Sequence, residues 1–443
     1  MSRKNIFLPW QFKYLAQGLA ISLLPNATLL TAQAVAAENR LEEVVVVAQR
    51  REQNLQDTPI ALSVMSSDDM LKQGMSSLLD LRDGSIPSLK IVPFPNDPSV
   101  LQIGMRGISQ SDVGQFTKEM AVGIYQDGIY LGRAQGLGME LVSLERIEVL
   151  RGPQGTLYGR NALGGAVNII TKKPSTDAVE MKFDATLGNY DLNKYAVHAN
   201  LPLGDRAAML FSHSASERDG WVRNGLGSDY NMHDKNGTRL ALRFDPVEDF
   251  TIDYSYDESD IRSTQVYYQI RRVESEPSTG LPWADLAVEP DRLDNARFDL
   301  NNDPSQTDTK GHALVLSWRG LENHEVKYMG SHREIEGTLN NNYNGAFLVG
   351  NTNSTNDSQK QSSHELQFQG SFLDEGLQYT AGIFYYEEET DEQQETLISL
   401  LPVGQDGLPL LALSNPSATN LPNSLLPLYR RNELGPTGQS IVN

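Results

Sequence analysis

The stretch Val149–Pro174, VLRGPQGTLYGRNALGGAVNIITKKP, separates two parts of the chain that differ in their pattern of apolar and polar residues. It holds five glycines and four basic residues, and it ends in a β-branched run followed by KKP. A glycine-rich segment beside a cation can cradle phosphate, but Gly155 and Gly159 lack the GxxxxGK[ST] spacing of a phosphate loop. The glycines instead favour tight turns, and AVNIIT predicts a last strand before a domain boundary at Pro174.

Beyond this boundary, apolar and polar residues alternate along the chain. In VEMKFDATL, the odd-numbered residues Val179 to Leu187 are apolar and the residues between them are polar. The same period of two recurs at 194–201, 207–215, 239–245, 250–257, 312–319, 325–331, 363–370 and 376–386. Such alternation predicts strands with one apolar face, about nine in all.

The lengths of the links between these strands separate a soluble sandwich from a membrane barrel. Short links such as LPLGDR and DPVEDF alternate with long ones near 216–237, 258–310, 331–360 and 388–438. Outer-membrane barrels have short turns at one end and long loops at the other, whereas very long loops are unusual in compact soluble domains. We therefore expect an antiparallel transmembrane β-barrel over residues 175–443.

The part before the boundary predicts a separate α+β domain over residues 59–174. Short apolar pieces alternate with turn residues, and a helix is expected between Ser66 and Gly84, where serine and aspartate start it and glycine stops it. Roughly 115 residues are enough to bury a core of their own.

The N-terminus predicts export. Arg3, Lys4 and Lys13 precede an apolar stretch that ends in the small-residue pattern Ala34–Ala36, so residues 1–36 resemble a signal peptide. No later run approaches the roughly 18 apolar residues of a membrane-spanning helix. Removing three basic residues shifts the net charge from −20 to about −23, which disfavours nucleic-acid binding, and the chain has no cysteine.

Residues 37–58 are polar except around the segment Glu42–Ala48, EEVVVVA, which we call the valine segment. A β-branched block flanked by charge is suited to pairing with the edge of another sheet, where main-chain hydrogen bonds supply affinity. It could equally be the first strand of the following domain. The residues alone leave both interpretations open.

The whole chain resembles TonB-dependent outer-membrane receptors. LEEVVVVAQRREQNLQDTPIALSV is similar to the family's TonB box and plug start, and IGMRGI, VGIYQDGIYL and LERIEVLRGPQGTLYGRNALGGAVNIITKKP are similar to plug landmarks in their usual order. The resemblance implies a plug inside a barrel of about 22 strands. It also implies that the TonB protein of an inner-membrane complex pulls on Glu42, Glu43, Val44, Val45, Val46, Val47 and Ala48, and that the complete receptor is a monomer in the outer-membrane lipid. Val47 stands where relatives often have threonine.

Two plug arginines, Arg106 and Arg151, match family positions that form ion pairs with glutamates on the barrel wall. The alternative is that both anchor turns through carbonyl groups. The glutamates are expected outside these strands, because about nine strands are too few for a bacterial barrel with an even strand number. We therefore expect a C-terminally truncated chain that does not insert and transport by itself.

The resemblance implies active uptake of a scarce nutrient, most often a ferric siderophore. Phe94, Gln110 and Phe116, at outward plug loops, are candidate ligand contacts, or else they only tether the plug. Alternatives are a receptor for cobalamin, haem or glycans, or a passive porin or surface adhesin. The seven histidines are scattered, and no catalytic, metal or cofactor motif is found, so we expect neither an enzyme nor a bound cofactor.

Overall fold

The fold is taken from a computed structural model, which describes residues 45–48, 50–51, 53–110, 112–116, 118–139, 141–225, 227–269, 291–296, 302–342, 349–372, 377–400, 431–434 and 440–442. The expected signal peptide and the first three residues of the valine segment, Glu42 to Val44, lie outside these ranges. None of the helices in the described part is long and apolar enough to cross a membrane.

The plug is built on two small sheets. The larger has the strand order β3-β9-β10-β7-β8, in which only the β10–β7 pair is parallel. Its strands are β3 (Leu62–Ser66), β7 (Val122–Gln126), β8 (Ile129–Leu131), β9 (Leu144–Arg151) and β10 (Gly165–Thr171). The smaller sheet holds β4 (Leu89–Phe94), β5 (Asp97–Met105) and β6 (Ile108–Ser109).

The prediction of a single helix between Ser66 and Gly84 is wrong in one respect, because the helix is interrupted in its middle. α1 (Ser67–Lys72) starts at a capping box formed by Ser66 and Asp69, and the 3-10 helix η2 (Leu78–Asp83) follows. Gly74 separates them with a φ of 68°, a left-handed conformation that ends a helix. A second helical turn, α2 (Gly155–Tyr158), lies within the glycine-rich stretch.

Alternating residues of the larger sheet point into two cores. Ile147 and Val149 of β9 join the main core, together with residues of the smaller sheet. Leu150 belongs to a second core on the opposite face, and Glu148 shares that side of the strand. Val46 and Ala48 of the valine segment pack into this second core, which also contains Tyr125, Tyr130, Tyr158, Ala162 and Ala166.

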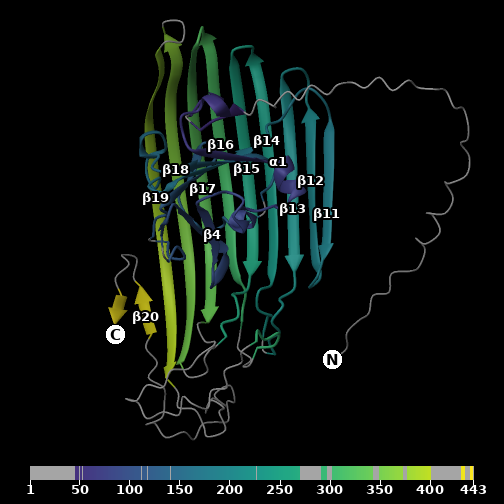
Figure 1. The fold of residues 1–443 in the computed structure, drawn as a ribbon, viewed down its shortest axis with the longest axis vertical. Coiled ribbons are helices and arrows are strands. Elements are labelled where there is room, and N and C mark those ends of the chain that lie inside the picture. Colours follow the sequence, from purple (N-terminus) through teal and green to yellow (C-terminus); the bar gives the residue numbers. More distant parts are fainter. Residues whose placement is uncertain are drawn as a thin grey trace, which may run out of the picture. The chain divides into compact units, whose positions relative to one another are not determined.

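The wall is one antiparallel sheet in which each strand pairs with its neighbours in sequence (Figure 1). The strands are β11 (Glu180–Gly188), β12 (Leu192–Pro202), β13 (Ala207–Arg218), β14 (His233–Val247), β15 (Phe250–Ser263), β16 (Ser305–Leu321), β17 (His324–Asn342), β18 (Val349–Phe372), β19 (Leu377–Leu400), β20 (Arg431–Leu434) and β21 (Ser440–Val442). Each of the nine predicted strands matches one of β11–β19 to within one residue, so these strand predictions are confirmed.

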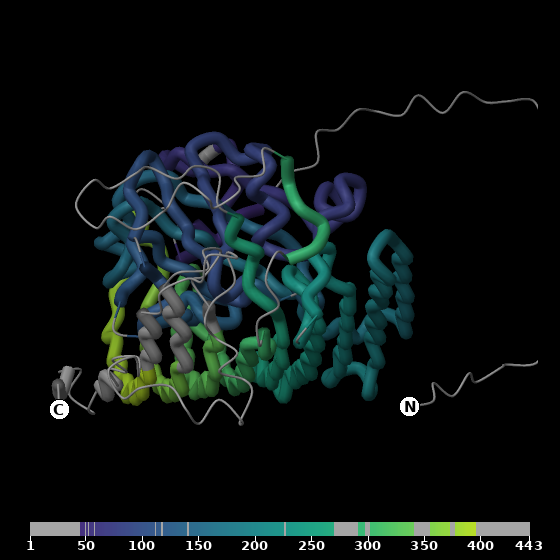
Figure 2. The backbone as a smooth tube through the Cα atoms, turned by 90° about the horizontal axis from the view of Figure 1, so that it is seen from below, coloured from purple at the N-terminus to yellow at the C-terminus, as the bar shows by residue number. Residues whose placement is uncertain are grey.

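The wall has an apolar outer face and a polar inner face. Met181 and Phe183 are 76% and 67% exposed, whereas Ser212, Ser214 and Ser216 on the other side of the sheet are buried. Figure 2 shows the plug packed on one side of this wall. A sheet that exposes its apolar side and buries its polar side suits lipid outside and a hydrated plug inside, as in outer-membrane barrels.

The strands run further than their apolar alternation does. β17 continues to Asn342 and β18 begins at Val349, so the long link expected at 331–360 is wrong and only 343–348 lie between these strands. In the same way β15 continues to Ser263 and β16 begins at Ser305. These strand ends are mostly polar on both faces, with single exceptions such as Ile261 and Ile335, so backbone pairing continues after the alternation has disappeared.

Candidate functional site

The valine segment is docked on the plug in an extended conformation. Val45–Val46 form β1, which pairs antiparallel with β2 (Gln53–Asn54). Val46 and Ala48 are fully buried, whereas Val45 is 44% exposed. The backbone N–H of Val47 donates to Oε1 of Glu148 at 3.0 Å. One edge of the short strand is therefore occupied, and its alternate side chains are buried.

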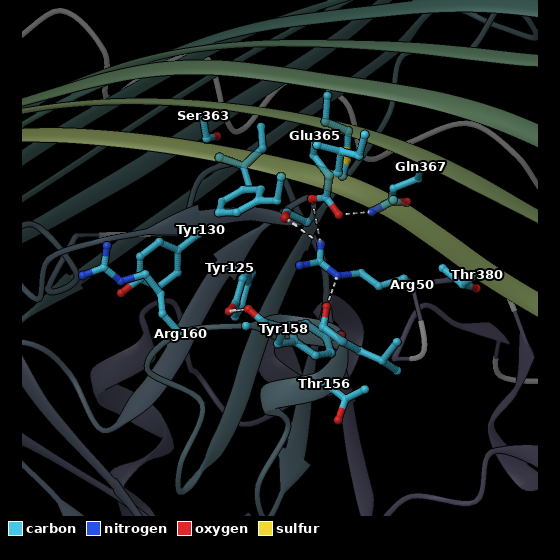
Figure 3. A pocket seen from close by; sticks show the side chains of 18 of the residues that line it. Arg50, Tyr125, Tyr130, Thr156, Tyr158, Arg160, Ser363, Glu365, Gln367 and Thr380 are labelled. Carbon is cyan, nitrogen blue, oxygen red and sulfur yellow. Dashed lines mark hydrogen bonds and ion pairs between the residues drawn. The ribbon is translucent and has the colours of Figure 1, made fainter.

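Arg50 holds the chain directly after the valine segment (Figure 3). Its guanidinium lies over the rings of Tyr158 and Tyr125, at 4.7 and 5.3 Å from their centroids. Its Nε donates to the carbonyl of Leu157 at 3.1 Å, and one terminal nitrogen donates to the carbonyl of Gly128 at 2.8 Å. Burial raises the pKa of both tyrosines, so their rings remain neutral partners for the cation.

Arg50 also links the segment to the wall. Its guanidinium lies 3.9 Å from a carboxylate oxygen of Glu365, and its carbonyl accepts a hydrogen bond from Gln369 at 2.7 Å, both on β18. The link borders a cavity of about 370 Å³ between plug and wall. Plug residues Tyr130 and Arg160 and wall residues including Gln367 and Thr380 line it.

A charge network joins the turn between β7 and β8 and the end of β10 to the wall. Arg333 of β17 donates to both carboxylate oxygens of Asp257 on β15, at 3.1 and 2.9 Å. Arg239 of β14 lies 3.7 Å from Asp257 and donates to the plug residues Asp127 and Thr171, at 3.0 and 2.9 Å. Asp257 and Arg239 are both 5% exposed. Charges so far from water require such partners.

Elsewhere the plug–wall interface combines uncharged hydrogen bonds with separate charged contacts. The direct contacts include Ser99–Thr307 (3.0 Å), Gly132–Gln361 (3.0 Å), Gln361–Tyr130 (2.8 Å), Lys235–Gly138 (2.7 Å) and Arg133–Glu388 (2.7 Å). Water can replace hydrogen bonds of this kind at modest net cost, unlike a continuous apolar interface. The plug is therefore held in one position without being fused to the wall.

Arg106 and Arg151 both lie at the ends of plug strands. Arg106 is exposed in the turn between β5 and β6, and its guanidinium lies against the backbone of Gly152. Arg151 ends β9, where its N–H donates to the carbonyl of Ala61, and its Nε is buried without a hydrogen-bond partner. Within the described ranges neither reaches a wall carboxylate. The ion pairs with wall glutamates stay a prediction, since their partners are expected outside these strands.

The three candidate ligand contacts lie in different surroundings. Phe94 is half-buried, with its ring against the backbone of Gly114. Gln110 accepts a hydrogen bond at its carbonyl from the side chain of Gln102. Phe116 is only 1% exposed, and its N–H donates to Glu392 of β19 at 3.1 Å. Burial of the Phe116 ring favours its alternative role as a tether, while the ligand role of all three stays untested.

The sequence did not single out Arg50, Asp127, Glu148, Arg239 or Asp257. A signal existed for two of them, because Arg239 and Asp257 stand at inward positions of predicted strands, where a charge facing a plug requires a partner. Asp127 also lies in the quoted landmark VGIYQDGIYL. Their pairing could not be read from the sequence, since Arg239 and Asp127 are 112 positions apart.

A plug domain held on the polar inner face of an outward-apolar sheet defines the class of plugged outer-membrane barrel proteins. Residues 54–166 match the model of the TonB-dependent receptor plug domain. The chain is 27% identical over 219 residues to the vitamin B12 transporter BtuB of Vibrio vulnificus, covering 48% of this chain and 33% of that protein. It is 32% identical over 137 residues to an iron-regulated outer membrane virulence protein of Vibrio cholerae, covering 30% and 20%.

The fold also matches solved receptors. The ferric yersiniabactin uptake receptor FyuA from Yersinia pestis superposes with a TM-score of 0.62 at 17% identity, covering 77% of this chain and 50% of that one. The chain thus spans a third or less of these curated relatives and about half of this structure. Residues 54–166 therefore form a TonB-dependent receptor plug domain, and the location of the protein is the cell outer membrane.

Proposed function

We propose that the chain is part of a receptor that takes up a ferric siderophore or similar iron complex, energised through the TonB protein. The observation that carries this proposal is the valine segment, which is extended, has a short strand partner and continues directly into Arg50. A partner that adds a strand to this segment would pull on the contacts of Arg50 with plug and wall.

The arrangement of the plug supports transport over a passive pore or an adhesin. A plug joined to the wall by polar contacts and buried charges blocks passive flow and can still be displaced. The relatives whose names mention iron or ferric yersiniabactin favour an iron complex. Because one relative is a vitamin B12 transporter, cobalamin is the second candidate substrate, and haem and glycans rank below it.

Growth under iron limitation tests the substrate class. A strain that makes no siderophore and lacks other receptors of this kind would receive the full-length gene and be supplied with single ferric siderophores, haem or cobalamin. We expect growth on at least one ferric siderophore and none with the empty vector. Rescue only in a cobalamin-dependent assay, with no iron source supporting growth, would replace this proposal by cobalamin uptake.

A further inference from the structure

The plug contains a carboxylate that is completely shielded from solvent. Glu148 lies in β9 between β3 and β10, and its side chain is 0% exposed. Its neighbours Ile147 and Val149 point into the main core, so Glu148 points to the opposite face, where the valine segment lies. A buried carboxylate is costly unless hydrogen-bond donors surround it.

Among the described residues, three donors reach this carboxylate, and one of them belongs to the valine segment. Arg146 Nε donates to Oε1 at 2.8 Å, and Asn168 Nδ2 donates to Oε2 at 3.4 Å. The backbone N–H of Val47 donates to Oε1 at 3.0 Å. Two donors come from the same sheet and remain whatever the segment does, whereas the third leaves when the segment undocks. A hydrogen bond to an ionised acceptor is roughly twice as strong as a neutral one.

We infer that Glu148 is the positioning residue of the valine segment, and that its charge sets how often residues 45–48 leave the plug. The apolar contacts of Val46 and Ala48 supply burial, which does not depend on direction. The hydrogen bond from Val47 to Glu148 is directional, and it therefore fixes the position of the valine segment along β9. This inference rests on the proposed function in one respect. The proposed function interprets undocking as the step that exposes the valine segment to the TonB protein.

The competing account gives Glu148 a purely structural role as the partner of Arg146. Arg146 has a second carboxylate partner, Glu145, whose side chain is 45% exposed and has no contact with the valine segment among the described interactions. Under the competing account, neutralising Glu145 and neutralising Glu148 should disturb the plug to the same extent. Under ours, only Glu148 controls the segment.

Cysteine labelling separates the two accounts, because the chain has no cysteine of its own. Val46→Cys places a thiol at a position that is 0% exposed while the segment is docked. Val122→Cys places one in the main core, also at 0% exposure, and reports opening of the plug itself. The labelling rate with a maleimide would be measured for the intact receptor in isolated outer membranes.

We expect Glu148→Gln to raise the labelling rate at position 46 roughly tenfold, because the acceptor oxygen remains but its charge is lost. Glu148→Ala should raise it further, since the acceptor is removed as well. Labelling at position 122 should stay unchanged in Glu148→Gln. The matched control Glu145→Gln makes the same chemical change beside the same arginine and should leave position 46 at the wild-type rate.

Equal labelling of position 46 in wild type and both Glu148 variants would overturn the inference. So would an equal rise at positions 46 and 122 in Glu148→Gln, because it would mean that the whole plug is loosened. The readout needs neither TonB nor substrate. Failure of the growth assay therefore leaves the inference standing, and failure of the labelling assay leaves the proposed uptake standing.

Discussion

An Asp257→Ala receptor is expected to lose about 3–5 kcal/mol of stability at the charge network that supports the plug sheet on the wall. Asp257 accepts hydrogen bonds from Arg333 and forms an ion pair with Arg239, and both arginines lie on the inner face of the wall. Its removal leaves Arg333, whose side chain is only 13% exposed, without this partner and leaves Arg239 with Asp127 as its remaining carboxylate. Unpaired buried charge is among the most destabilising changes a single substitution makes.

Hydrogen exchange of the β10 amides in the intact receptor would measure this loss. β10 ends at Thr171, whose hydroxyl accepts a hydrogen bond from Arg239, so the strand opens when the network fails. Exchange should become more than about 100-fold faster in Asp257→Ala. Asp260→Ala is the matched control, since it removes the same group from the outer face of the same strand. Equal exchange in the two variants would show that the network does not hold the plug.

A disulfide between plug and wall is expected to stop uptake completely. The hydroxyls of Ser99 on β5 and Thr307 on β16 are buried and 3.0 Å apart, which brings their Cβ atoms near the range that a disulfide spans. The double variant Ser99→Cys, Thr307→Cys would tie the plug covalently to the wall. If the substrate passes only after the plug separates from the wall, the oxidised receptor should bind its ligand at the surface and import none.

Uptake before and after reduction is the measurement for this variant. A reductant should restore import to the level of the two single-cysteine variants, which control for the substitutions themselves. Full import by the oxidised receptor, with cross-linking shown to be complete, would mean that this part of the plug stays on the wall during transport.

The sequence predicted the wall better than its ends. Alternation located β11–β19 because outward residues such as Met181 and Phe183 are apolar and inward residues are polar. Where β17 and β18 become mostly polar on both faces, the alternation is lost although the backbone pairing continues. The sequence predicted one helix between Ser66 and Gly84 and did not predict the interruption at Gly74. A glycine is tolerated within a helix, and its left-handed conformation here is selected by tertiary packing.

The site was harder to predict than the fold. Family landmarks located the valine segment and the plug. The charge network, however, depends on the register of the wall strands, which decides which residues of separate strands lie side by side. Asp257 and Arg333 meet only because β15, β16 and β17 pair in one register. Similarly, Glu148 is one of many carboxylates in the sequence, and only its burial beneath Val47 distinguishes it.

Uptake by cells whose receptor lacks residues 42–48 tests the central claim most directly. Cells with the intact receptor, the deletion, and the intact receptor after collapse of the proton gradient would be compared for surface binding and import of the ligand identified in the growth assay. We predict unchanged surface binding in all three, with import by the deletion reduced to that of the de-energised cells. Import by the deletion at the full rate would contradict energised transport through the valine segment.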